Sequence, residues 1–77
     1  MLREHQVIVV FGSEALEVLK KHRVKTDAKS WNRYFKAVSS KDAIELCKCS
    51  LMDCLTRTLP EDVSQRIVDT CEYRIGQ

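Results

Sequence analysis

The sequence predicts a mainly α-helical domain, a compact bundle of about four helices with a short strand before it, in the order β-α-α-α-α. Three observations favour this fold class. One β-branched run lies near the N-terminus, apolar residues elsewhere recur mainly at helical spacing, and the 77 residues include only two glycines and one proline. A chain of this length forms a single small domain, residues 1–77, and its core is small enough that its stability is marginal.

Residues 6–11 read QVIVVF and are typical of a buried strand, because β-branched and aromatic residues follow one another without a helical period. Gly12 ends the strand, and Ser13 is a favourable N-cap for a first helix to about Arg23. A single strand cannot satisfy its own backbone hydrogen bonds. Three partners are therefore open: a second copy of residues 6–11 in a homodimer, the tail at 72–75 in extended form, or a strand from another protein.

The second predicted helix begins at Thr26 or Asp27 and runs to about Val38. Trp31 and Phe35 are four residues apart, which places both on its inner face.

Ser39 or Ser40 caps the third helix, which covers residues 42–57, and Pro60 either stops that helix or starts the fourth. The fourth helix carries an amphipathic stripe made of Val63, Ile67, Val68, Cys71 and Ile75.

The order of strand, short helix, turn and helix over residues 5–38 resembles the ribbon-helix-helix family of DNA-binding dimers. The resemblance implies a two-stranded antiparallel ribbon in the major groove, with residues 6–11 supplied by each subunit. Such a ribbon needs polar side chains to reach base edges, and only His5 and Gln6 are polar here. We therefore transfer no base-contacting residues from that family.

The four cysteines are expected to be mostly structural. Three of them lie in the stretch LCKCSLMDCL, where helical spacing produces an apolar seam of Ile44, Cys47, Leu51 and Cys54. Cys71 lies on the facing stripe. Cys49 points about 160° away from the seam and is expected to be the exposed thiol. There are three alternatives. The ligand spacing argues against a metal site, and a reducing compartment argues against a Cys54–Cys71 disulfide. The lack of a neighbouring base argues against a catalytic thiol.

Charge is segregated along the chain. Residues 20–48 hold nine lysines and arginines against three acids, a balance of +6, while each flank sums to −2. This pattern favours an anionic partner, either nucleic acid or an acidic protein surface, and a solvated face is the simpler reading. The candidate contact residues are Lys20, Lys21, Arg23, Lys25, Lys29, Arg33 and Lys36.

No catalytic or cofactor motif stands out, and we expect no catalytic residues, cofactor or metal. The longest apolar run, Val7 to Phe11, is too short for a membrane span or a signal sequence, so we expect a cytoplasmic, reducing location without membrane contact. The sequence therefore predicts a small non-enzymatic regulatory module whose basic face binds nucleic acid. The alternative is a protein-interaction module, a small regulator or inhibitor that docks on a larger protein, with strand pairing as one means of docking.

Overall fold

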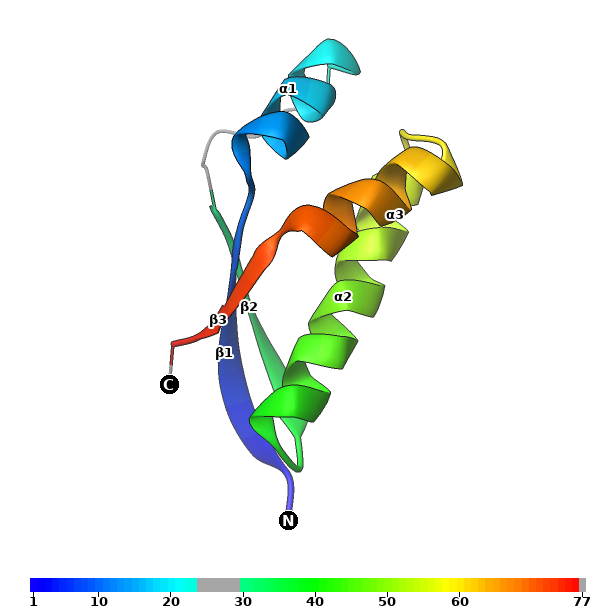
Figure 1. Ribbon diagram of the computed structural model, residues 1–77. Coiled ribbons are helices and arrows are strands. Elements are labelled where there is room, and N and C mark those ends of the chain that lie inside the picture. The colour runs from blue at the N-terminus through cyan, green and yellow to red at the C-terminus, as the bar shows by residue number, and fades with distance from the viewer. Residues whose placement is uncertain (24–29, 77) are drawn as a thin grey trace.

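The computed structural model describes residues 1–23 and 30–76, and these form an α/β fold (Figure 1). The elements in chain order are β1 (Arg3–Val10), α1 (Ser13–Lys21), β2 (Ser30–Ala37), α2 (Ser40–Thr56), α3 (Glu61–Thr70) and β3 (Glu72–Ile75). The predicted bundle of four helices is therefore wrong: the described residues contain three helices and a three-stranded antiparallel sheet. No helix among them is long and apolar enough to cross a membrane.

β1 is the central strand of the sheet, whose order is β2-β1-β3. Val7 lies opposite Arg33 of β2 on one side and opposite Ile75 of β3 on the other. Of the three partners left open for the N-terminal strand, the tail at 72–75 is therefore one that the structure shows. Because both edges of β1 are paired over residues 7–10, strand pairing through residues 6–11 in a homodimer loses its basis.

The segment from Ser30 to Ala37, predicted as the end of a second helix, is strand β2, and the predicted start of that helix lies outside the described residues. The error has a physical cause. Trp31 and Phe35 are four positions apart, and this spacing places them on one face of a helix and equally on one face of a strand. The arrangement implied by the ribbon-helix-helix resemblance requires a helix at these residues, so the structure does not have that arrangement.

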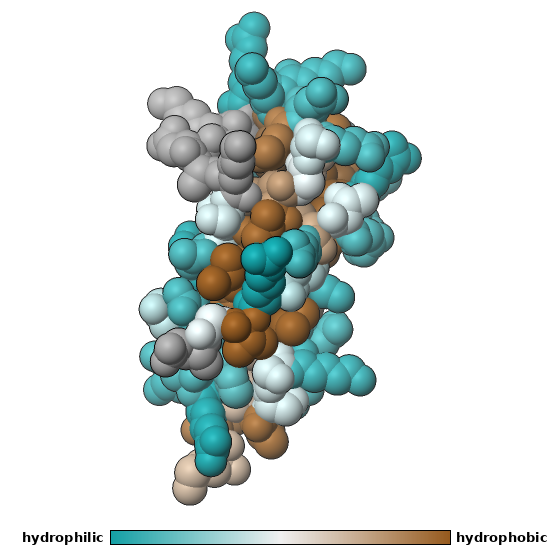
Figure 2. Space-filling model, turned by 60° about the vertical axis from the view of Figure 1, so that its left-hand side comes forward, coloured by the Kyte–Doolittle hydropathy of each residue, from teal (hydrophilic) through white to brown (hydrophobic). Residues whose placement is uncertain are grey.

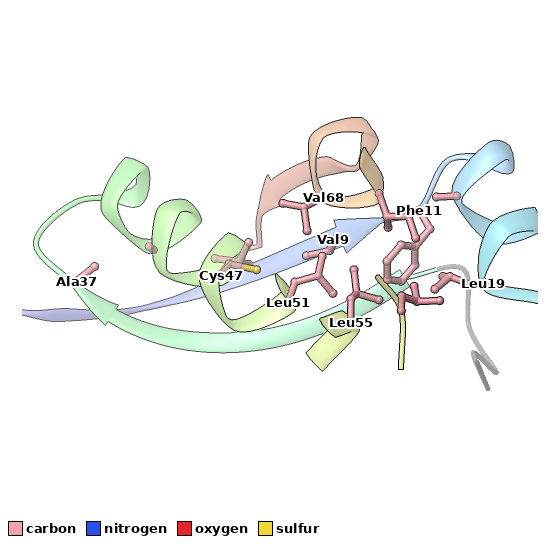
Figure 3. Packing of buried hydrophobic residues seen from close by; sticks show 13 residues of the cluster. Val9, Phe11, Leu19, Ala37, Cys47, Leu51, Leu55 and Val68 are labelled. Carbon is pink, nitrogen blue, oxygen red and sulfur yellow. The ribbon is translucent and has the colours of Figure 1, made fainter. Parts of the chain in front are cut away.

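α2 covers one face of the sheet and begins where the sequence predicts, with the Ser39 hydroxyl accepting a hydrogen bond from the Asp42 N–H at 3.2 Å. Its buried face advances in steps of four residues, through Ala43, Cys47, Leu51 and Leu55. These side chains meet Val9 of β1 and Val68 of α3 in the core (Figure 3). The predicted seam is therefore half right, because Cys47 and Leu51 are buried and Cys54 is exposed.

The predicted fourth helix is shorter than expected. α3 ends at Thr70, and the chain turns into β3, which leaves Ile75 on a strand instead of on the apolar stripe. The Tyr73 hydroxyl donates a 2.6 Å hydrogen bond to the Val68 carbonyl and so ties β3 back to α3.

α1 closes the upper end of the core in Figure 1 with Ala15 and Leu19, both buried. Phe11 and Leu19 approach Leu55 of α2 in Figure 3. After the helix, Arg23 adopts a φ of 59°, in the left-handed region that favours glycine.

Candidate functional site

The structure separates the basic residues that the sequence places on one surface. Lys20 and Lys21 are exposed in the last turn of α1, with Arg23 just beyond it. Arg33 and Lys36 are both exposed on β2, and their odd spacing sends them to opposite faces of the sheet. The predicted helical line through residues 29, 33 and 36 is therefore wrong. Two further predicted contacts, Lys25 and Lys29, lie outside the described residues.

The face of the sheet away from α2 carries partly buried Ile8 and Val10. Apolar side chains gather near the middle of this side of the molecule, among hydrophilic ones (Figure 2). The charged side chains on this face of the sheet balance in sign. Arg74 forms an ion pair with Glu72 at 3.1 Å, and Lys36 lies opposite Glu4. This face is consequently neutral, with Tyr34 standing 62% exposed beside its centre.

The outer edge of β2 carries backbone groups that no described residue pairs. The Gly76 N–H donates to the Gln6 carbonyl at 2.8 Å, so the backbone groups of Gln6 point toward β3. Successive residues of a strand alternate sides, so those of Val7 point toward β2, where Val7 lies opposite Arg33. The N–H and C=O of Arg33 therefore face β1, and those of Tyr34 face outward.

By the same alternation, Asn32 and Lys36 also direct their backbone groups to the outer edge. One outward acceptor is already used, because Arg33 Nη1 donates to the Asn32 carbonyl at 3.0 Å. The Arg33 guanidinium also lies over the Trp31 ring, 4.6 Å from its centroid. Within the described residues, neither Arg33 nor Lys36 has a carboxylate within 4.0 Å. β2 contains no Asp or Glu, so this edge presents two unpaired cations.

One hollow lies away from this edge and another reaches it at Lys36. One, of about 160 Å³, opens between α1 and α3, with Val18 and Val63 in its apolar part and Lys21 and Arg66 among its charged residues. The other lies where β2 meets α2, beside the exposed side chains of Leu2, Val38 and Leu46. Neither hollow gathers a catalytic constellation such as a nucleophile with its base.

The cysteines divide into two buried or half-buried thiols and two exposed ones. Burial raises the pKa of Cys47 from 9.0 to about 11, with a smaller contribution from the nearby Cys71, and Arg33 opposes this shift. Burial likewise raises the pKa of Cys71 to about 11. Cys49 is exposed, as predicted. In the described parts of the chain, no three His, Cys, Asp or Glu side chains gather closely enough to hold a metal ion.

Comparison of the chain with protein-family models, with curated proteins and with solved structures gave no match. Of the two edge strands of the sheet, β2 is the longer, with eight residues against four in β3, and sequence reasoning missed its edge. Its sequence signal is the alternation in SWNRYFKA, where Ser30, Asn32, Tyr34 and Lys36 share the face away from α2.

Proposed function

We propose that this chain is a small non-enzymatic interaction module that binds an extended segment of another protein by adding it to the outer edge of β2. One observation carries the proposal: outward backbone groups at Asn32, Tyr34 and Lys36 along an edge strand of eight residues. In strand addition, main-chain hydrogen bonds supply affinity and alternate side chains supply specificity.

The distribution of charge supports a protein partner over nucleic acid. Binding to a phosphate backbone draws on cations clustered along one surface. Here Lys20 and Lys21 lie on α1, while Arg33 and Lys36 point to opposite faces of the sheet. The face away from α2, which could serve as a stacking platform, is neutral. Nucleic-acid binding stays a prediction from the sequence and is one outcome of the test below.

A second copy of the chain is a poor occupant of this edge. Antiparallel pairing of β2 with another β2 would place four cations and no acid on the two strands, and a register that sets Arg33 opposite Arg33 or Lys36 opposite Lys36 would put like charges directly opposite each other. Like charges on neighbouring strands destabilise the pair, and cations on an edge strand are a common defence against self-association. We therefore expect sedimentation velocity to give a monomer.

The test selects displayed random linear peptides on the folded chain and maps the binders by amide chemical shifts and hydrogen exchange. We expect the Asn32, Tyr34 and Lys36 amides to gain protection when a peptide binds. Tyr34→Pro removes one outward N–H and should abolish binding, whereas the matched control Tyr34→Phe keeps that N–H and should retain it.

Two results would overturn the proposal. One is the absence of any peptide that protects the outer amides of β2. The other is salt-dependent binding of generic duplex DNA or single-stranded RNA with shifts centred on Lys20 and Lys21, because this would favour the nucleic-acid function.

A further inference from the structure

We infer that the segment added to β2 is acidic and carries two carboxylates three residues apart, one facing Arg33 and the other facing Lys36. This inference rests on the proposed function and names the chemistry of its partner. It follows from the placement of the only two charged side chains on β2.

The spacing of three comes from the geometry of the sheet. Arg33 shares its face with Val7, on the side that α2 covers, and Lys36 shares its face with Glu4, on the open side. In a paired strand, directly opposite residues point to the same face. A segment in register with β2 thus needs one carboxylate on each face, three positions apart, whether it runs parallel or antiparallel.

The neighbouring positions favour apolar side chains. Trp31 and Phe35 are partly buried on the same face as Arg33, so a β-branched residue opposite each would cover the part that is still exposed. Tyr34 lies between them on the open face and is 62% exposed. The preferred pattern is therefore acid, apolar, any, acid, any, apolar, beginning opposite Lys36 in an antiparallel segment.

Both cations are available to a partner. An incoming backbone N–H would take the Asn32 carbonyl that Arg33 now occupies, which frees guanidinium N–H groups for a carboxylate. Lys36 lies opposite Glu4 of β1 and shares a hollow with Asp42 and Glu45, yet none of these acids lies within 4.0 Å of its ammonium group. The same two cations disfavour a second β2, so they select for an acidic segment.

The experiment uses synthetic valine–threonine peptides of the same length as β2, which has eight residues. One peptide carries glutamates three positions apart, a second carries them two apart on one face, and a third carries glutamine in their place. Affinities are measured by fluorescence titration, and the binding site is mapped by amide exchange at Asn32 and Tyr34. We expect the glutamine peptide to bind about 2- to 30-fold more weakly than the first peptide, the range of two exposed charge pairs, and the second peptide to fall between them.

Charge reversal assigns each contact. Lys36→Glu should weaken the first peptide, and replacing one glutamate by lysine should restore binding, whereas replacing the other should not. Arg33→Glu should show the opposite preference. The matched control Lys20→Glu makes the same charge change on α1 and should leave the affinity within about 2-fold.

The outcomes separate the two proposals. Equal binding of all three peptides at the β2 edge would overturn the acidic pattern and leave strand addition standing. Failure of every peptide to protect Asn32 and Tyr34 would overturn strand addition together with the pattern.

Discussion

Proline placed at neighbouring positions of β2 tests the alternation on which the binding edge depends. Arg33→Pro removes an N–H that faces Val7 of β1, whereas Tyr34→Pro removes one that faces outward. Proline fixes its own φ near a value that an edge strand tolerates. It also favours an extended backbone at the preceding residue, and in both variants that residue is already part of the strand. The two variants therefore differ mainly in whether a ladder hydrogen bond is lost.

The expected magnitudes differ clearly. At Arg33 the loss of the hydrogen bond costs about 1 kcal/mol, and the Val7 carbonyl, left unpaired in a residue with no exposed surface, adds about 1–3 kcal/mol. Arg33→Pro should thus cost about 2–4 kcal/mol, a large share of the roughly 4–12 kcal/mol expected for a domain of this length. Tyr34→Pro should cost less than about 1 kcal/mol, since it breaks no ladder bond.

Urea unfolding followed by far-UV circular dichroism measures both variants, and amide hydrogen exchange of the unmodified chain gives an independent check. The amides of Trp31, Arg33 and Phe35 should exchange slowly and those of Asn32 and Tyr34 quickly. Equal losses of stability in the two variants, or equal protection along the strand, would refute the assignment of the outer edge.

Four further results are expected. In urea unfolding, Leu51→Ala should lower the free energy of unfolding by about 2–5 kcal/mol, because Leu51 is 2% exposed. Leu46→Ala should change it by no more than about 0.5 kcal/mol, because Leu46 is 46% exposed. Similar losses in the two variants would contradict the packing of α2. Cys49 should react with a thiol reagent well before Cys47. Because burial raises the Cys47 pKa from 9.0 to about 11, its contribution to stability is complete below pH 9 and should fall by about 2–3 kcal/mol between pH 9 and pH 11, so a flat pH profile would argue against a buried thiol. Arg23→Gly should raise the free energy of unfolding by about 0.5–1 kcal/mol, because glycine adopts the left-handed φ of residue 23 without steric strain. Arg23→Ala keeps a Cβ and therefore the strain, so it should not stabilise the fold.

Elements with one dominant local signal could be predicted from the sequence. The apolar run at residues 6–11 lies in strand β1 except for Phe11, since the strand covers Arg3–Val10, and Ser39 supplies the cap of α2. The burial of Cys47 and the exposure of Cys49 follow from helical geometry alone. Cys54 was misplaced because α2 packs against a sheet, and its buried face follows the four-residue steps through Leu51 and Leu55.

The candidate site was far less predictable. Lys20, Lys21 and Arg23 were placed correctly near the end of the first helix. Arg33 and Lys36 were expected on one helical face, but the strand separates them. The outer edge of β2 is not predictable from a segment whose aromatic spacing suits a helix as well as a strand.

β1 and the helix that Ser39 caps follow from the sequence alone, because the side chains of each segment favour its local structure. The states of residues 30–37 and 72–75 depend on tertiary contacts. The spacing of Trp31 and Phe35 suits either a helix or a strand, and the segment at 72–75 is too short for its sequence pattern to indicate a secondary structure. Both segments become strands because β1 needs backbone hydrogen-bond partners on its two sides. β2 supplies them on one side and β3 on the other. The free edge of β2 follows from that pairing, and so does the interaction proposed for it.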